Sequence, residues 1–153
     1  MSDLLETHRH SITGFELPVP VGWERSEEVE ACALVAVEPP RGDPHLRANV
    51  VVTLEVVPED EDLEAWTLRS LASLRESLQE AQVLDVETLE IGGVPARRAL
   101  THYLHADHGG AALEQWLLLH RGLGMVISCT TAALEYDDLF DLTHAIAEGL
   151  RLP

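Results

Sequence analysis

The chain has 153 residues, a length typical of one compact domain, and its 46% hydrophobic and 24% charged residues exclude a disordered or fibrous protein. The ten basic residues are all arginine and stand against 27 acidic ones, so the formal net charge is −17. Because nucleic-acid binding depends on cationic side chains, we expect no nucleic-acid partner. Adaptation to high salt and a codon bias toward arginine would both produce this composition.

The sequence shows no sign of membrane insertion. Its apolar runs, such as residues 31–37 and 116–119, are too short to span a bilayer. Acidic and histidine residues within the first ten positions interrupt any signal-peptide core, so we expect a cytoplasmic chain. Cys32 and Cys129 lie in apolar, strand-like runs and are expected to be buried free thiols.

The first third of the chain predicts strands after a polar start. Residues 1–10 are expected to form a flexible N-terminal arm, and residues 11–153 a single domain. A strand over residues 11–17 ends in a turn rich in proline and glycine, and a second strand over residues 32–37 stops at two prolines. The strongest strand pattern is the valine-rich run at residues 49–57.

The hydrophobic period then changes to that of a helix. Apolar residues recur at helical intervals over residues 63–78, behind an acidic start that suits the positive end of a helix. Three glycine-containing turns follow, and they separate four short strands at residues 83–91, 96–105, 112–120 and 125–131. This is the pattern of an antiparallel meander. A closing helix is expected over residues 136–151.

The turns also predict how the meander pairs. Placing Ala106 opposite Ala111 and His120 opposite Met125 divides the apolar residues between two faces. One face then holds Leu100, Leu104, Leu113, Leu117 and Leu119, and the other holds Tyr103, Trp116, Leu118, Ile127 and Cys129. Because both faces are apolar, each needs a covering helix. We therefore predict an α+β fold, a three-layer α/β/α sandwich around a mainly antiparallel sheet of about six to seven strands.

Three histidines form the most suggestive motif for a metal. His102, His105 and His108 are three residues apart, a spacing that would place them on one face of a helix. The segment is predicted to be a strand that runs into a turn, and residues three apart on a strand point to opposite faces. We therefore expect no metal site and no cofactor.

Covalent catalysis has little support in the sequence. There is no Gly-x-Ser-x-Gly motif, and the paired glycines join strands instead of opening a helix as phosphate-binding loops do. A His120–Cys129 dyad is conceivable, but a buried structural cysteine is the commoner arrangement. We therefore assign no catalytic residues and expect a protein that is not an enzyme.

Polar residues on the apolar faces are candidate binding residues. Gln115 is predicted to lie opposite His102, and Arg98 opposite Leu119. A buried amide or guanidinium without partners costs about 1–3 kcal/mol, so each must belong either to a satisfied structural network, to the rim of the sheet or to a polar spot in a groove.

Aromatic residues supply two further candidates. Trp66 fits the core side of the first helix, and Trp23 fits packing at a turn. Trp116, which shares its predicted face with Tyr103, is the best candidate for a contact surface. The predicted binding residues are therefore Trp116, Tyr103, Gln115 and His102.

Several short segments, taken in this order, carry a resemblance over nearly the whole chain. They are Phe15-x-Leu17-Pro18-x-Pro20-x-Gly22-Trp23, Ala48-Asn49-Val50-Val51-Val52, Ile91-Gly92-Gly93-x-Pro95-Ala96, Gln115 and the strand Gly124–Thr131. With them the chain resembles the PsbP-like, MOG-type α/β/α sandwich superfamily, and it is most similar to the bacterial, actinobacterial-looking LpqN-like and DcrB-like members. Members of that branch are often lipoproteins, whereas this sequence has no lipobox cysteine near Met1.

The resemblance implies a scaffold without an active site, whose relatives bind partner proteins or assist secretion and the assembly of complexes. Our first hypothesis is accordingly a non-enzymatic protein-binding accessory module, with a protein partner of unknown identity and a homodimer through one sheet face as a further expectation. A second hypothesis is a small-ligand or lipid carrier with a groove between sheet and helix, near Gln115 and His102. A third is a metal-dependent hydrolase at the histidines.

Overall fold

The structure is a computed structural model that describes residues 4–153. Strands are the commonest element within these residues, and two α-helices and the short 3-10 helix η2 accompany them. In chain order the elements are β1 (Leu5–Arg9), β2 (Glu16–Pro20), β3 (Glu24–Ser26), β4 (Leu34–Val37), β5 (Asn49–Val56), α1 (Leu63–Ser77), β6 (Gln82–Ile91), β7 (Val94–His105), β8 (Gly109–His120), β9 (Leu123–Ala132), η2 (Ala133–Glu135) and α2 (Tyr136–Glu148).

A seven-stranded antiparallel sheet forms the middle layer. Its strand order is β3-β4-β5-β9-β8-β7-β6, so β9 pairs with β5 and the meander β6 to β9 supplies four of the seven strands. β1 and β2 form a separate two-stranded sheet. The predicted strands at residues 83–131 and both predicted helices are therefore present, and β3 is an additional short strand at one edge.

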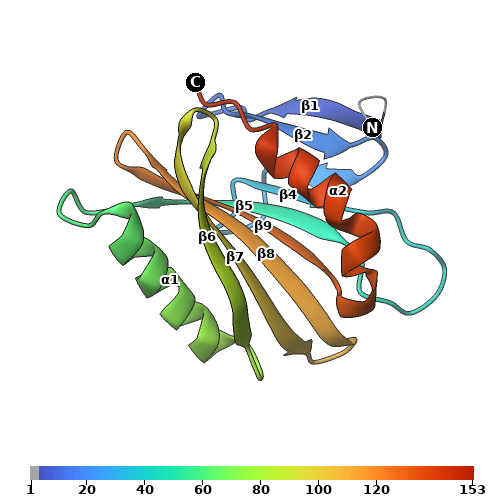
Figure 1. Ribbon diagram of the computed structural model, residues 1–153. Helices are drawn as coiled ribbons and strands as arrows, with labels where there is room; N and C mark the ends of the chain where they lie inside the picture. The colour runs from blue at the N-terminus through green and yellow to red at the C-terminus, as the bar shows by residue number, and fades with distance from the viewer. Residues whose placement is uncertain (1–3) are drawn as a thin grey trace.

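The two helices cover opposite faces of the sheet (Figure 1). On one face, α2 and the β1–β2 hairpin enclose the larger core, which includes Leu17, Trp116, Ile127 and Ile146. On the other face, Trp66 of α1 packs with Leu117 of β8 and with neighbouring apolar residues. The predicted three-layer α/β/α sandwich around an antiparallel sheet is confirmed.

The turn between β6 and β7 sets the register of that pair. Gly92 and Gly93 both have positive φ, as the two central residues of a type I′ turn require. Ile91 therefore lies opposite Val94, and Glu90 lies opposite Pro95. Pro95 has no N–H to donate, so it fits a position where the two strands exchange no hydrogen bonds.

The predicted pairing of β7 with β8 is wrong by three residues. His105, instead of Ala106, precedes the loop, and it lies opposite Gly109, whose positive φ closes a three-residue connection. An odd shift moves every side chain of one strand to the other face. Leu100 and Leu104 therefore share a face with Trp116 and not with Leu117, although both faces of the sheet remain apolar.

The pairing of β8 with β9 differs from the prediction by two residues, which leaves the faces unchanged. His120 lies opposite Leu123, because Arg121 and Gly122 alone form the turn. Gly124 belongs to β9 and not to the turn. A Cβ at this position would lie 2.5 Å from Cζ2 of Trp66, so glycine is needed where the α1 indole lies on the strand.

Two further differences concern the ends of the chain. Leu5–Arg9, expected within a flexible arm, form β1 and pair with β2, while residues 1–3 of that arm lie outside the described residues. The closing helix ends at Glu148, before the predicted Arg151. Gly149 follows it, and Pro18 of β2 occupies the space that a side chain at Gly149 would need. Within residues 4–153, neither helix is long and apolar enough to cross a membrane.

Candidate functional site

The structure distributes the four predicted binding residues over both faces of the sheet. Trp116 and His102 project toward α2, whereas Gln115 and Tyr103 project toward the α1 side. Gln115 lies opposite Ala99 and not opposite His102, and its amide donates to the Ser128 hydroxyl over 3.2 Å. The four side chains therefore do not form one site.

Trp116 is a core residue and not part of a contact surface, which corrects the prediction. Its side chain is fully buried, and its ring contacts the His144 ring edge to face at a centroid distance of 5.2 Å. The prediction was wrong because the sequence pattern of an apolar strand face is the same whether a helix of the same chain or a partner protein covers that face. Here α2 covers it.

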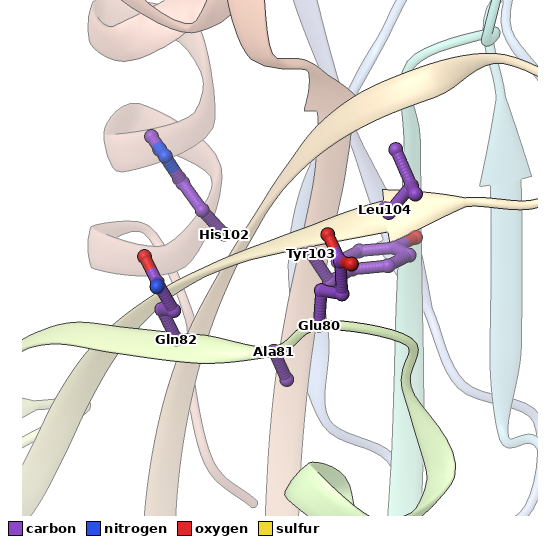
Figure 2. Close-up of a pocket in the computed structure, with 6 residues that line it drawn as sticks. All are labelled: Glu80, Ala81, Gln82, His102, Tyr103 and Leu104. Atoms are coloured by element: carbon purple, nitrogen blue, oxygen red, sulfur yellow. The ribbon is translucent and has the colours of Figure 1, made fainter.

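His102 and Tyr103 line a shallow hollow of about 470 Å³ at the end of β6 and β7 (Figure 2). Glu80, Ala81, Gln82 and Leu104 complete its lining. His102 and Gln82 pair across the two strands, and their side chains project side by side. Burial raises the pKa of the Tyr103 hydroxyl above its ordinary value. The hollow is open to solvent and does not gather polar groups around an enclosed space, so it resembles a surface depression more than a ligand pocket.

The three-histidine motif is divided as the strand geometry predicts. His102 projects toward the α2 side, His105 projects to the other face, and His108 lies in the turn with its ring 4.9 Å from that of His105. Over residues 4–153, no three His, Cys, Asp or Glu side chains are grouped so that they could hold a metal ion.

Both thiols are free, and Cys129 is buried within β9 as predicted, whereas Cys32 lies just before β4 and is only partly buried. Cys129 is buried next to Val50 and Glu114, and burial, followed by the nearby Glu114 charge, raises its pKa. In β8 and β9 it lies six residues along the strands from His120, about 20 Å at strand spacing. The structure therefore excludes a His120–Cys129 dyad.

The most unusual chemistry on the sheet is a buried charged group that we call the Glu114 cluster, made of Glu114, Arg98, Tyr136 and His144. Glu114 of β8 is 1% exposed. Its Oε2 accepts hydrogen bonds from Arg98 Nη1 over 2.5 Å and from the Tyr136 hydroxyl over 3.0 Å, and its Oε1 lies 2.9 Å from His144 Nε2. The cluster thus joins β7, β8 and α2.

Two carboxylates of the edge strand β6 extend the cluster to the surface. Arg98 Nε donates to Glu87 over 2.7 Å, and its Nη2 donates to Asp85 over 2.6 Å. The hydrogen bond from Arg98 lowers the pKa of Glu87, whereas burial and the charge of Glu114 raise the pKa of Tyr136. Three carboxylates share one guanidinium, so this part of the surface carries surplus negative charge.

The hydrogen bonds of the cluster hold α2 on the sheet. Both oxygens of Glu114 already accept hydrogen bonds, and all three nitrogens of Arg98 have carboxylate partners. A buried ion pair of this kind requires such saturation to offset its desolvation. The His144 ring is further fixed by stacking on Phe140 at 3.8 Å.

Sequence reasoning found only one member of this cluster. Arg98 was singled out and lies in a satisfied network, although opposite Trp116 and not Leu119. Glu114 lies two residues from the apolar Ala112 and Trp116 on either side and so shares their strand face, which is the pattern of a buried acid. The spacing of Tyr136, Phe140 and His144, four residues apart on a helix, was the second available signal.

The chain is similar to known proteins in its structure and not in its sequence. No family model and no curated protein sequence matches it. Cyanobacterial PsbP (CyanoP) from Synechocystis sp. PCC 6803 superposes with a TM-score of 0.74 at 16% identity, over 97% of this chain and 92% of that one.

Two other solved structures agree with this match. LpqN, involved in cell envelope biogenesis of Mycobacterium tuberculosis, gives a TM-score of 0.71 at 20% identity and covers 97% of this chain and 91% of its own. The Ran-binding protein Mog1p of Saccharomyces cerevisiae gives 0.60 at 17% identity, over 97% and 85% of the two chains. At this level of identity the likeness identifies the fold alone: the chain has the PsbP-like, Mog1-type fold.

Proposed function

We propose that this chain is a non-catalytic accessory module that binds another protein. Two of the proteins that share its fold are Mog1p, a Ran-binding protein, and LpqN, which is involved in cell envelope biogenesis, and neither description names a catalysed reaction. A common fold does not transfer a partner, so the proposal needs support from this chain's own surface.

The observation that carries the proposal is a difference between two neighbouring parts of the sheet: the polar groups of the Glu114 cluster bond to one another, whereas the edge strand β6 leaves its side chains exposed. The Glu114 cluster is internally saturated, so it offers no group to a substrate. The neighbouring strand β6 exposes Leu84 and Val86 together with half-exposed carboxylates. Apolar side chains bordered by charged ones are typical of a surface that binds proteins.

The finer role that we propose is assistance in secretion or in the assembly of an envelope complex. The description of LpqN supports this direction, and the two free cysteines fit a reducing compartment such as the cytoplasm. A homodimer through a sheet face stays a prediction.

A small-ligand or lipid carrier has less support. The enclosed apolar pocket that borders Phe15, Leu54 and Met125 has a volume of about 50 Å³. Pockets that hold drug-sized ligands measure roughly 300–1,000 Å³. Neither Gln115 nor His102, the polar groups expected in such a groove, lines this pocket.

The experiment is affinity capture from native lysate with the whole chain as bait, followed by calorimetry with the purified candidate. An unrelated acidic domain of similar net charge serves as the control bait. We expect a protein that binds the chain directly in a defined ratio and does not bind the control. The proposal fails if every captured protein binds both baits equally, since charge alone would then explain the capture.

A further inference from the structure

Within residues 4–153, no strand pairs with the outer side of β6 in the central sheet. β6, ten residues long, ends the strand order at one side, whereas the opposite edge strand, β3, has three residues. Natural proteins usually shorten or cover such edges, because their free backbone groups can pair with another chain. A long open edge is therefore a feature that calls for an explanation.

The register shows which backbone groups of β6 are free. The two-residue turn makes Ile91 and Val94 a hydrogen-bonded pair, and such pairs alternate along an antiparallel ladder. Leu89, Glu87 and Asp85 therefore bond to β7. Val86, Thr88 and Glu90 direct their N–H and C=O groups outward, away from the sheet.

The side chains of β6 differ sharply between its two faces. Val86 lies on the α1 face and is 43% exposed, and Leu84, at the irregularity in the β6–β7 register, is 52% exposed. On the α2 face, Asp85 and Glu87 point to Arg98 and keep side-chain exposures of 54% and 50%. Over residues 84–87 an added strand would thus meet apolar residues on one face and carboxylates on the other, whereas farther along the α1 face carries the exposed Thr88 and Glu90.

The charges favour one kind of occupant over the others. Asp85, Glu87 and Glu114 share the guanidinium of Arg98, and Glu114 also contacts His144, so among the described residues Asp85 and Glu87 are the two carboxylates of this group without a second basic partner. A second copy of this chain paired through β6 would add the same acids to this face, and like charges on adjacent strands are unfavourable. A segment that alternates cationic with apolar residues would complement both faces.

Building on the proposed function, we propose that β6 is a docking edge for an extended basic segment of a partner protein, which adds to the sheet as an eighth strand. Its arginine or lysine side chains lie over Asp85 and Glu87, and its apolar side chains cover Val86. Main-chain hydrogen bonds to Val86, Thr88 and Glu90 supply affinity, and the alternating side chains supply specificity.

The probe is a synthetic octapeptide that alternates valine with arginine, and its control has the same composition with four valines followed by four arginines. Both are titrated into the ¹⁵N-labelled full chain and followed by NMR. We expect the alternating peptide to bind at least tenfold more tightly and to shift amide signals mainly within residues 82–91. Equal binding of the two peptides, or shifts elsewhere, overturns the proposal.

Two pairs of variants separate strand addition from simple charge attraction. Val86→Pro removes an outward N–H and should weaken binding at least tenfold, whereas Val86→Ala, which keeps that N–H, should weaken it less than threefold. Asp85→Asn should weaken binding severalfold, and Asp60→Asn, the same charge change at an exposed position in the loop before α1, should change it less than twofold. If Val86→Pro does not fold, the proposal is still tested by the binding affinities of Asp85→Asn and Asp60→Asn and by the positions of the shifted amide signals. Equal effects of the two aspartate variants contradict the proposal.

The outcome is distinguishable from that of the proposed function. If a natural partner binds Val86→Pro and Asp85→Asn as tightly as it binds the wild type, the chain is a protein-binding module and β6 is not its docking edge. If the free wild-type chain is a dimer by native mass spectrometry and Val86→Pro is a monomer, a second copy occupies the edge and the proposal is wrong.

Discussion

Arg98 is the residue on which the buried Glu114 cluster depends. Within residues 4–153 it is the one arginine that contacts Glu114, whose other basic partner is His144. Removing one partner of a buried ion pair leaves an uncompensated charge and typically costs about 3–5 kcal/mol. We therefore expect Arg98→Met to lower the free energy of unfolding by about that amount, measured by urea denaturation at pH 7.

The control for this variant removes both charges. Replacing Glu114 as well, in Arg98→Met/Glu114→Leu, leaves no buried charge without a partner and should recover part of the lost stability. The double variant would then be more stable than Arg98→Met alone. A loss below about 1 kcal/mol for Arg98→Met would show that water reaches Glu114 and that the cluster does not fix α2.

Gly124 provides a second test at the scale of one residue. A Cβ there would lie 2.5 Å from Trp66 and 2.8 Å from Val57, so we expect Gly124→Ala to destabilise the fold by about 1–3 kcal/mol. Gly110→Ala is the matched control, because its Cβ would meet only Ala133 at 3.5 Å. Thermal unfolding of the two variants compares them directly, and equal melting temperatures would contradict the packing of α1 described here.

The attachment of β1 to the rest of the fold depends on a titratable group. Glu27, next to the edge strand β3, accepts hydrogen bonds from the Ser11 hydroxyl and backbone N–H and lies 2.7 Å from His8 Nε2. These contacts, of which the Ser11 hydroxyl is the largest, lower the pKa of Glu27 from an ordinary 4.5 to about 2. The ionised carboxylate therefore pins the N-terminal hairpin beside β3.

The lowered pKa gives a prediction with a definite sign. The contribution of Glu27 to stability is complete above the unfolded pKa near 4.5 and is lost as the pH falls through about 2. We therefore expect Glu27→Gln to lower the melting temperature at pH 6, and the difference from the wild type to shrink between pH 4.5 and 2. A difference that stays constant over this range would contradict the prediction.

Ser11→Ala is the control for the cause of that shift. It removes the hydroxyl that is the largest contributor and keeps the backbone N–H, so the pKa of Glu27, followed by NMR titration, should rise part of the way toward 4.5. An unchanged pKa would show that His8 and His10, and not the Ser11 hydroxyl, lower the pKa of Glu27.

The elements could be predicted from the sequence because each has a local signal. The helix at 63–78 was found from the spacing of its apolar residues, and the structure places α1 at Leu63–Ser77. Turn residues were less informative. Glycine marked the β7–β8 and β8–β9 connections, but Gly110 and Gly124 lie within strands, and pattern alone does not separate a turn glycine from one that makes room for a neighbour such as Trp66.

The candidate site was harder to predict than the fold. The sequence analysis pairs β7 with β8 in a register that is three residues off. This odd shift placed two of the four predicted binding residues, His102 and Tyr103, on the wrong faces relative to Trp116 and Gln115 of β8. Glu114 contacts residues of β7 and of α2, which are 16 to 30 positions away in the sequence. Such contacts follow from the tertiary arrangement and leave only weak traces in the local pattern.

The whole molecule combines a widely shared fold with an unusual charge. Structures that are only 16–20% identical superpose over nearly the full chain, so the layers and the order of strands tolerate almost complete replacement of side chains. The net charge of −17 is not needed for the fold, and repulsion among the acids opposes the compact state. Salt should therefore stabilise the folded chain.

The salt response also distinguishes the two explanations of the acidic composition. The screening length falls from about 30 Å at 0.01 M to about 8 Å at 0.15 M, so relief of repulsion is largely complete at moderate salt. We expect the melting temperature to rise up to about 0.3 M KCl and then to level off. That result favours a codon bias, whereas a rise that continues to about 2 M would indicate adaptation to high salt. A variant with exposed acids neutralised, Glu59→Gln/Asp60→Asn/Glu76→Gln, should show a smaller rise, and an unchanged rise would contradict repulsion as its cause.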